Sequence, residues 1–303
     1  MKILVSGSTG FIGSELTAHL KSKGHSVVRL VRAKSGAGGE EILWNPVARV
    51  IDRKQLEGLD AIVHLAGDPI AQGRWTPEKK ARIRDSRVKG TRFLAESVAQ
   101  LAKPPKTFLC ASAIGVYGDR GSETVSEESP PGAGFLAETG IAWEKACEPA
   151  AQKGLRVVNL RIGVVLSPKG GALKMMLPPF QLGVGGVLGN GRQFMSWVAL
   201  PDVIAAFHHA LITESLRGPV NVVSPNPVTN QEFTKTLGAT LRRPTFLPVP
   251  SFTVLALFGE MGQELLLAST RVEPRRLKST GYRFLHPDLD GALRALLAKR
   301  GVS

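Results

Sequence analysis

The sequence contains little cysteine and few aromatic residues. Its 303 residues include two cysteines, Cys110 and Cys147, which rules out a disulfide framework, and no Cys/His cluster near them suggests a metal site. Aromatic residues make up 6% of the chain, whereas glycine occurs 33 times. That balance favours an α/β protein with many tight strand-to-helix turns over a bundle of long helices. Free cysteines are typical of a reducing compartment, so we expect a cytoplasmic protein.

Long apolar runs are also missing. The apolar run that follows Lys2, residues 3–5, is too short for the core of a signal peptide. No stretch reaches the roughly 18 apolar residues that a membrane span needs. With 43% hydrophobic residues, the chain has the composition of an ordinary globular protein of one large or two modest domains. We therefore expect no membrane partner.

Acidic residues are scarce relative to basic ones. The chain has 39 Lys and Arg against 25 Asp and Glu, for a net charge of +14. Residues 74–92 carry eight basic and two acidic residues, and residues 271–283 carry five and one. Neither stretch interleaves aromatic residues with its charges, as a base-stacking platform would, so we expect no nucleic-acid partner. Solvated helix faces account for most of the charge, and a site for a small, highly phosphorylated ligand is the alternative.

The first 32 residues show the clearest pattern in the chain. An aliphatic run at 2–6 predicts a strand, residues 7–13 form a glycine-rich turn, and 14–23 has helical spacing that ends at Gly24. A second strand follows at 26–31. This strand, turn, helix and strand make a βαβ unit, which implies a right-handed crossover and a doubly wound parallel sheet.

The alternation of strands and helices continues over more than half of the chain. We expect strands at 61–65, 107–110 and 156–160, separated by helices at about 78–102 and 138–153. The sequence therefore predicts an α/β fold with a Rossmann-type doubly wound parallel sheet.

The rest of the chain has a different composition. Residues 167–192 are rich in Gly, Pro and Met, residues 252–258 form an apolar segment, and 288–299 predicts a final helix. We predict an NADP-binding Rossmann domain over 1–166, with 199–224 returning to it, and a smaller C-terminal α+β substrate domain over 167–198 and 225–303. A glycine-rich loop over 167–194 would cover the substrate cleft.

The glycine-rich turn points to a phosphate ligand. Phosphate must approach the backbone closely at this bend, and glycine leaves room for it. The helix that follows directs its N-terminal N–H groups and positive dipole end toward a pyrophosphate. Gly7, Gly10 and Gly13 lie between two strands at the expected distances, which predicts dinucleotide binding. A structural tight turn without a ligand is the alternative.

The end of the second strand discriminates between cofactors. An NAD site places Asp or Glu about 20 residues beyond the glycines, whereas an NADP site places Arg there for the 2′-phosphate. Arg32 stands 19 residues after Gly13, with Lys34 and Ser35 nearby and no acid before Glu40. We therefore expect NADP(H), with NAD less favoured. In the alternative, Arg32 is a solvated charge and the cofactor is NAD.

These residues resemble the short-chain dehydrogenase/reductase superfamily in its extended, epimerase-like branch. Five motifs within residues 1–224 carry the resemblance: Gly7-x-x-Gly10-x-x-Gly13, Ile62-Val63-His64-Leu65-Ala66-Gly67, Arg87-Val88-Lys89-Gly90-Thr91, Ser112-Ala113-Ile114-Gly115-Val116-Tyr117-Gly118 and Trp197-Val198-x-x-x-Asp202-Val203.

A narrower resemblance spans nearly the whole chain. It is to the atypical epimerase-family proteins, once loosely labelled cell-division inhibitor-like, which end in a small uncharacterised C-terminal domain. The motifs that carry it are Leu177-Pro178-Pro179-Phe180, Gly189-x-Gly191-Arg192-Gln193, Gly218-Pro219-Val220-Asn221-Val222-Val223-Ser224-Pro225 and Gly281-Tyr282-x-Phe284.

The resemblance implies which residues hold the cofactor. Three segments contribute, at the glycine turn, the end of the second strand and the end of the fourth: Gly7, Thr9, Gly10, Phe11, Ile12 and Gly13 for the pyrophosphate, Val31 and Arg32 for the adenosine ribose phosphate, and Leu65, Ala66 and Gly67 beneath the ribose. Arg87 departs from the extended branch, which usually carries Asn there. It is similar to an Arg of the atypical group and would reach toward the cofactor, while Lys79 and Lys80 would lie on the outer surface. A plain surface charge is the alternative for Arg87.

The catalytic residues of the family are missing from this sequence. Short-chain dehydrogenases use a Tyr as acid/base, a Lys four residues later that lowers its pKa, and a Ser or Thr that orients the substrate. The resemblance puts Ala113 at the Ser place, and counting back eight residues from Glu144 puts Leu136 and Gly140 at the Tyr and Lys places. The familiar triad is therefore absent.

Other polar residues remain as catalytic candidates. Ser112 and Tyr117 flank the substrate side of the turn after the fifth strand, although packing is the more common role for such a tyrosine. Glu138 and Glu144 lie on the helix that normally carries the Tyr, where solvated charge is the favoured interpretation.

Histidines give weaker signals. His64 ends an apolar strand and is interpreted as a core imidazole with satisfied hydrogen bonds. The His208-His209 pair has no other ligands nearby, so we expect no metal site.

The resulting prediction is an NADP(H)-binding oxidoreductase or epimerase that acts on an unknown small organic substrate without the usual Ser-Tyr-Lys triad. A non-catalytic NADPH-binding sensor or interaction protein is the competing hypothesis, because the triad is missing. Direct nucleic-acid binding through the basic stretches is the third and least favoured.

Overall fold

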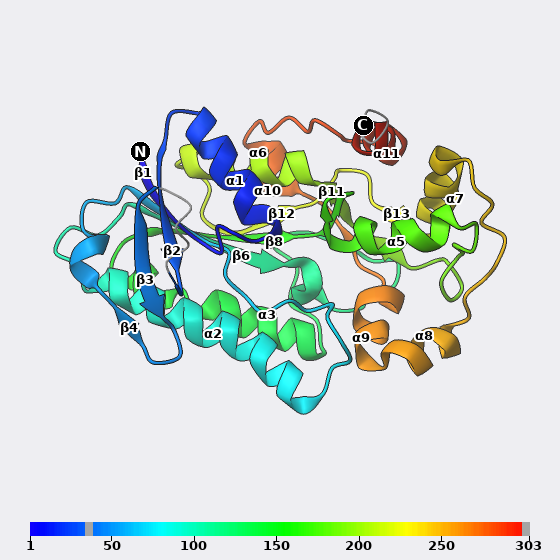
Figure 1. Cartoon of the computed structure of the whole chain (residues 1–303), viewed down its shortest axis with the longest axis horizontal. Helices are drawn as coiled ribbons and strands as arrows, with labels where there is room; N and C mark the ends of the chain where they lie inside the picture. The colour runs from blue at the N-terminus through cyan, green and yellow to red at the C-terminus, as the bar shows by residue number, and fades with distance from the viewer. Residues whose placement is uncertain (34–38, 299–303) are drawn as a thin grey trace.

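The protein is built on one eight-stranded sheet (Figure 1). The computed structural model describes residues 1–33 and 39–298. The strands of this sheet are β1 (Lys2–Ser6), β2 (Ser26–Val31), β3 (Glu41–Asn45), β4 (Val50–Ile51), β5 (Ala61–His64), β6 (Thr107–Ala113), β8 (Arg156–Ile162) and β12 (Gly218–Val222). Their order across the sheet is β12-β8-β6-β5-β1-β2-β3-β4, and all neighbours are parallel except β3 and β4. The predicted Rossmann-type doubly wound sheet is confirmed.

Helices cover both faces of the sheet. In Figure 1, α1 (Phe11–Ser22) and α6 (Leu200–Ile212) lie on one face, and α2 (Pro77–Ala99) and α3 (Phe135–Lys145) lie on the other. Strands covered on both sides carry continuous apolar runs, as in β5, whose four residues are all buried. The start of α2 follows from its sequence, because Thr76 accepts a hydrogen bond from Lys79 N and Pro77 takes the first helical position.

One predicted helix is divided in two. The expected helix at 138–153 is α3 followed by α4 (Glu148–Gln152), so this prediction was wrong in its continuity. Pro149 explains the break, because its ring would collide with the carbonyl of Lys145, four residues earlier, if the helix continued. Lys145 is the last residue of α3.

A second hydrophobic cluster lies beside the sheet. It joins α5 (Gly171–Gln181), α7 (Asn230–Leu241) and α11 (Leu289–Ala298), with Phe180, Trp197 and Phe233 among its buried residues. Lys299, the last residue of the helix predicted at 288–299, lies outside the described residues.

The stretch expected to be a glycine-rich loop contains a helix. Residues 173, 177 and 180 recur at helical spacing and are buried, which explains α5. Pro178 and Pro179 remove two backbone donors from it, and the residues whose carbonyls lose them, Lys174 and Met175, are exposed to water.

The C-terminal region contacts both clusters. The remaining elements, in this region and in the connections between the main strands and helices, are short: β7 (Thr124–Val125), β9 (Val164–Ser167), β10 (Phe194–Met195), β11 (Trp197–Ala199), β13 (Val228–Thr229), β14 (Arg271–Val272), α8 (Ser251–Phe258), α9 (Glu260–Gly262), α10 (Arg275–Ser279) and the helical turns η1 (Arg53–Leu56), η2 (Ile114–Tyr117) and η3 (Gln263–Leu267). Strand β14 pairs with β7, and Leu277 lies in the main core. The domain division at 167–198 and 225–303 stays a prediction. Within the described ranges, no helix has the length and apolar character to cross a bilayer.

Candidate functional site

The candidate site lies where the strand order reverses. The chain moves outward from β1 to β2 and β3, then returns to place β5 on the other side of β1. Ligands of open α/β sheets bind outside the carboxyl ends of the strands at such a switch point. Ser6 ends β1 and His64 ends β5, so the residues that follow them face this position.

The glycine-rich turn after β1 is too tight for side chains. Gly7 has φ +66°, and a Cβ there would lie 3.0 Å from the backbone nitrogen of Ala66. A Cβ on Gly13 would lie 2.1 Å from the Gly7 carbonyl oxygen, closer than any real contact. Both glycines are therefore required by the turn itself, which lets α1 start directly against the strand.

The start of α1 has free hydrogen-bond donors. Gly10 is its N-cap and supplies no side chain to accept from the first N–H groups. The Ser8 hydroxyl in the same turn is buried and has no hydrogen-bond partner among the described residues. Buried polar groups are normally paired, and an uncapped helix start attracts anions. The turn therefore fits a phosphate-bearing ligand.

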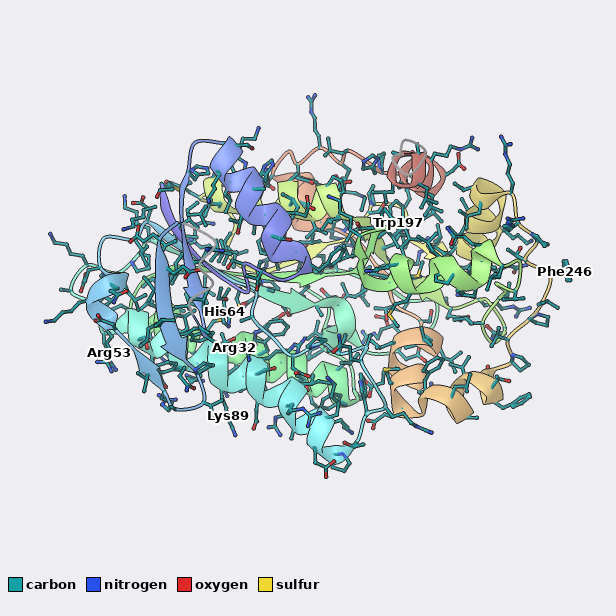
Figure 2. The ribbon with its side chains drawn as sticks, in the orientation of Figure 1. Arg32, Arg53, His64, Lys89, Trp197 and Phe246 are labelled. Atoms are coloured by element: carbon teal, nitrogen blue, oxygen red, sulfur yellow. The ribbon has the colours of Figure 1, made fainter. Side chains whose placement is uncertain are left out.

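Arg32 lies at the edge of this position. Its side chain is exposed just beyond β2, and it forms no ion pair with any residue of 1–33 or 39–298 (Figure 2). Val31 beside it is buried. Lys34 and Ser35, which the sequence analysis placed with Arg32, lie outside the described residues.

A buried histidine supports the end of β5. The Ser6 hydroxyl accepts hydrogen bonds from the N–H groups of Leu65 (3.1 Å) and Ala66 (3.3 Å) and lies 2.7 Å from His64 Nδ1. With both N–H groups donating to it, Ser6 donates its own proton to Nδ1, which leaves the ring proton on Nε2. Burial lowers the pKa of His64 to about 4, so the ring is neutral at pH 7. His64 is a core imidazole, as predicted, but the expectation that its hydrogen bonds are satisfied was wrong, because Nε2 has no partner in the described part of the chain.

Arg87 is held against the backbone after β5. It packs between Gly67, where a Cβ would lie 3.2 Å from its guanidinium carbon, and the Trp143 ring, 5.1 Å away. One of its nitrogens donates to the carbonyls of Asp68 (2.9 Å) and Ile83 (3.1 Å). Burial lowers its pKa to about 10, so it remains charged at pH 7. Arg87 is therefore a positive charge fixed at the carboxyl end of β5.

The prediction that Lys79 lies on the outer surface was wrong. Its side chain is buried, and its ammonium group is 2.5 Å from the Asp68 carboxylate. Lys80 is half-buried and pairs with Glu260 of α9 at 2.7 Å. Residues 74–92 are thus more than a solvated face, since part of their charge joins α2 to neighbouring segments.

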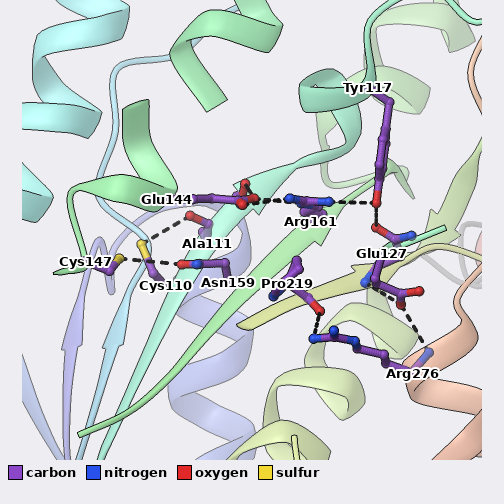
Figure 3. Close-up of polar contacts among 12 residues, drawn as sticks. Cys110, Ala111, Tyr117, Glu127, Glu144, Cys147, Asn159, Arg161, Pro219 and Arg276 are labelled. Atoms are coloured by element: carbon purple, nitrogen blue, oxygen red, sulfur yellow. Dashed lines mark hydrogen bonds and ion pairs between the residues drawn. The ribbon is translucent and has the colours of Figure 1, made fainter. Parts of the chain in front are cut away.

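A chain of hydrogen bonds crosses from β6 to β12. Ser112 donates to Glu144 (2.7 Å), and Arg161 donates twice to the same carboxylate, at 2.8 Å each (Figure 3). Arg161 also donates to the Tyr117 hydroxyl (2.9 Å), which donates to Asn221 (2.7 Å). Burial opposes the charge of Arg161, but the hydrogen bonds and charge of Glu144 keep its pKa above the ordinary value. The interpretation of Glu144 as a solvated charge was wrong, whereas Glu138 is exposed as expected.

Both catalytic candidates belong to this hydrogen-bonded chain. The Ser112 hydroxyl proton is committed to Glu144, and Tyr117 is fully buried with both of its hydrogen-bonding functions used. Burial raises the pKa of Tyr117. The catalytic assignment of these two residues stays a prediction, and their geometry is that of groups that hold β6, β8 and β12 together.

Helix α3 packs closely on the turn after β6 at the family's Tyr and Lys places. A Cβ added to Gly115 would lie 3.1 Å from the Cβ of Leu136. A Cβ added to Gly140 would lie 3.3 Å from the Cβ of Val116. With Ala113 at the end of β6, these positions present no ionisable group. That these are the family's Tyr and Lys places, and that the acid/base side chains are therefore absent, stays a prediction.

Glu264 is a contact that the sequence analysis missed. It belongs to η3 and accepts hydrogen bonds from the backbone N–H groups of Phe135 (2.8 Å) and Leu136 (2.9 Å), so it caps α3. A cap 128 residues away along the chain leaves no local signal in the sequence.

Asp202 is a second missed contact. It accepts hydrogen bonds from the N–H groups of Leu285 (2.7 Å) and His286 (3.0 Å), and it thereby ties the C-terminal region to α6. The sequence analysis had placed Asp202 in a family motif without this role.

The remaining histidines form no metal site among the residues described. His25 and His208 lie with their Nε2 atoms 3.3 Å apart, and His209 contacts Thr280 Oγ1 at 2.9 Å.

Known proteins resemble this chain over almost its whole length. A model of the NAD dependent epimerase/dehydratase family matches residues 3–223, and a domain of unknown function, DUF1731, matches residues 249–296. An epimerase family protein of Mycobacterium tuberculosis is 44% identical over 291 residues, 96% of each chain. The human epimerase family protein SDR39U1 is 37% identical over 98% of this chain and 100% of its own length.

A solved structure agrees with both the fold and the family. The crystal structure of human epimerase family protein SDR39U1 (isoform2) with NADPH has a TM-score of 0.89 and 36% sequence identity, and the match covers 98% of this chain and 99% of the human one. The family model spans most of the chain, and the relatives align from end to end. The chain therefore belongs to the NAD dependent epimerase/dehydratase family, and both resemblances drawn from its motifs are confirmed.

Proposed function

We propose that this protein binds NADPH at the glycine turn and catalyses hydride transfer to or from a small organic substrate. The observation that carries the proposal is the start of α1, where a helix without a side-chain cap follows a turn that requires glycine at Gly7 and Gly13. The human relative's structure with NADPH supports the same cofactor.

The residues present fit a dinucleotide phosphate. The unpartnered Ser8 hydroxyl and the first N–H groups of α1 supply hydrogen bonds for the pyrophosphate. Arg32, exposed beyond β2, supplies a charge-assisted hydrogen bond for a 2′-phosphate. Arg87 places a second positive charge at the end of β5. The two described residues that directly follow β2, Arg32 and Ala33, include no carboxylate of the kind that an NAD-preferring site uses for the 2′-hydroxyl.

The chemistry divides between the cofactor and the protein. When bound, NADPH would supply a hydride, and its oxidised form, NADP+, would accept one. The residues of this chain hold the cofactor at the strand ends and present an apolar side chain, Leu136, where the family places its general acid. Because Leu136 cannot donate a proton and Gly140 cannot lower a pKa, the proton of the reaction comes from another donor, either bound water or a hydroxyl such as that of Tyr117.

A second candidate function is that of a non-catalytic NADPH sensor. The observation that favours it is the same apolar set, Ala113, Leu136 and Gly140, since general acid/base catalysis contributes about 10²–10⁴-fold to rates. A screen of carbonyl substrates that follows NADPH oxidation separates the two functions. Tight NADPH binding with no oxidation across the screen would favour the sensor.

A titration of NADPH and NADH tests the cofactor assignment. We expect NADPH to bind at least tenfold more tightly, which corresponds to about 1.4 kcal/mol. Arg32→Ala is expected to remove this preference, while Arg53→Ala, an equally exposed arginine on η1, leaves it unchanged. Equal affinities in the unmodified protein would overturn the assignment.

A further inference from the structure

Several highly exposed apolar side chains belong to the segments at the end of the molecule opposite β4. These segments are two neighbouring loops and the start of α8, and their most exposed side chains are Leu182 (78%), Phe246 (76%) and Phe252 (74%). Val184 and Leu247 extend this group. We call these five residues the apolar patch. Figure 2 shows Phe246 at this extreme end, pointing away from the rest of the chain.

Backbone contacts hold the two loops side by side. Val249 N donates to Val187 O (2.8 Å), and Gly189 N donates to Val249 O (2.9 Å). Nearer the tip, a Cβ on Gly183 would lie 3.6 Å from Pro244. Helix α8 begins directly after this pairing, so Phe252 stands beside the loops. The loop members of the apolar patch therefore come from both sides of a paired backbone, and Phe252 follows three residues after Val249 on α8.

The segments that form the apolar patch carry charge of one sign. Residues 171–201 and 233–258 contain five basic residues and no acidic residue, and the basic ones are Lys174, Arg192, Lys235, Arg242 and Arg243. All five side chains are exposed, and none forms an ion pair within the described ranges. We call these five exposed side chains the cationic rim. Two carboxylates border the segments but have other partners: Glu232 bonds to Thr229, and Glu260 pairs with Lys80.

We propose that the apolar patch docks on the surface of a bilayer rich in anionic phospholipid. Large exposed apolar surfaces mark interaction sites, and aromatic and leucine side chains enter the headgroup boundary of a bilayer favourably. The cationic rim then faces lipid phosphates, which attract Lys and Arg at short range. An anionic bilayer thus contacts both the apolar side chains of the patch and the cationic rim.

Charge disfavours a second copy of this chain as the occupant. Two such surfaces brought together would oppose five positive charges with five of the same sign, which costs association energy. The earlier expectation of no membrane partner rested on the absence of a spanning run, and docking on a surface requires no span.

Vesicle co-sedimentation tests the proposal. The unmodified protein is expected to pellet with vesicles of equal phosphatidylglycerol and phosphatidylcholine, and to remain in solution with phosphatidylcholine alone. High salt should weaken binding because it screens the rim. The Phe246→Glu/Phe252→Glu variant and the Arg242→Gln/Arg243→Gln variant should each bind at least tenfold more weakly.

Matched controls lie at the other end of the molecule. Val47 is 93% exposed, so Val47→Glu places a charge on an exposed apolar residue outside the patch, and Arg53→Gln removes an exposed arginine elsewhere. Both controls should bind vesicles as the unmodified protein does. NADPH titration of every variant reports separately on the cofactor site and should give unchanged affinity.

Two results would overturn the proposal. One is binding that does not depend on anionic lipid, or no vesicle binding at all. The other is a dimer, seen by light scattering, that the Phe246→Glu/Phe252→Glu variant dissociates while the unmodified protein ignores vesicles. That result would assign the apolar patch to an interface between copies.

Discussion

Two regions at the carboxyl edge of the sheet differ in what they retain. At the glycine turn, backbone geometry and side chains agree: Gly7 and Gly13 admit no Cβ, and Ser8 has a buried hydroxyl without a partner. At the α3 side, a Cβ added to Gly115 or Gly140 would also meet a neighbour closely, at 3.1 and 3.3 Å, and the positions that we predict to correspond to the family's acid and base are Leu136 and Gly140. The first region thus has unpartnered groups that fit a ligand, while the polar groups beside the second are paired with one another.

If the predicted absence of the triad holds, the difference teaches that cofactor binding and acid/base chemistry are separable in this fold. Glu144 and Arg161 form a bidentate pair that also holds Ser112 and Tyr117. These polar groups form their hydrogen bonds with one another. Function in this fold has to be argued from the site, because a shared backbone does not guarantee shared chemistry.

The strongest way to break the comparison is to fill the glycine turn. Gly13→Ala places a Cβ 2.1 Å from the Gly7 carbonyl oxygen, so the turn must open. We expect at least a hundredfold loss of NADPH affinity, about 2.7 kcal/mol, measured by fluorescence titration together with the melting temperature. The matched control is Gly291→Ala, a helical glycine with no atom within 4 Å of an added Cβ, which should bind NADPH normally. Undiminished NADPH affinity in Gly13→Ala would contradict the account.

Breaking the ion pair of the second region should cost stability and spare binding. Arg161→Met leaves Glu144 largely buried without its partner, which costs about 3–5 kcal/mol in the free energy of unfolding. Urea unfolding measures this loss. Arg294→Met, which breaks an exposed pair with Asp290, should change stability by no more than about 1 kcal/mol. If folded Arg161→Met binds NADPH more weakly than the unmodified protein does, the two regions are energetically coupled, which would contradict the account.

Low pH should destabilise the strand end between the two regions. The folded-state pKa of His64 is about 4, below the ordinary value of 6.5, so the unfolded chain binds a proton first as pH falls. The stability due to neutral His64 is complete above pH 6.5 and declines by about 1.4 kcal/mol per pH unit toward pH 4, roughly 3 kcal/mol in all. Denaturant unfolding of the unmodified protein and His64→Asn across this range checks it. Identical pH slopes in the two proteins would show that His64 does not titrate in this way.

Much of the cofactor region could be predicted because its signals are local. The glycines, the strands around them and Arg32 lie within 32 residues, and steric requirements fix what each position admits. The break before Pro149 also has a local signal, the proline itself, which the predicted helix at 138–153 did not take into account. The short strand Glu41–Asn45 was not assigned, although its Ile42 and Trp44 alternate with exposed residues.

Long-range contacts could not be predicted from the sequence. Glu264 caps a helix 128 residues earlier, and Lys79 is buried because Asp68 receives it. The sequence around Glu264 or Asp68 does not distinguish these carboxylates from carboxylates that are exposed to water. The pairing of Glu144 with Arg161 joins a helix to a strand, so helical periodicity gave no sign of it.

The smallest predicted effect concerns Arg87, which lies between the two regions. Its charge, fixed at Gly67 and without a carboxylate partner in the described residues, should attract the cofactor phosphates. Arg87→Ala is expected to weaken NADPH binding about tenfold, or 1.4 kcal/mol. Lys89→Ala, two residues away and exposed, should have no effect, and it serves as a better control than the buried Lys79. If Arg87→Ala and Lys89→Ala bind NADPH with equal affinity, Arg87 has only a structural role.

A crystal structure with NADPH tests the central claim most directly. The account predicts the pyrophosphate on the N–H groups that begin α1, Arg32 at the 2′-phosphate, and no ionisable side chain in contact with the reactive carbon of the nicotinamide. Leu136 and Ala113 should be the protein groups on that side. A Tyr, Lys, His or acidic side chain in contact with that carbon, or a cofactor bound away from the glycine turn, would contradict it.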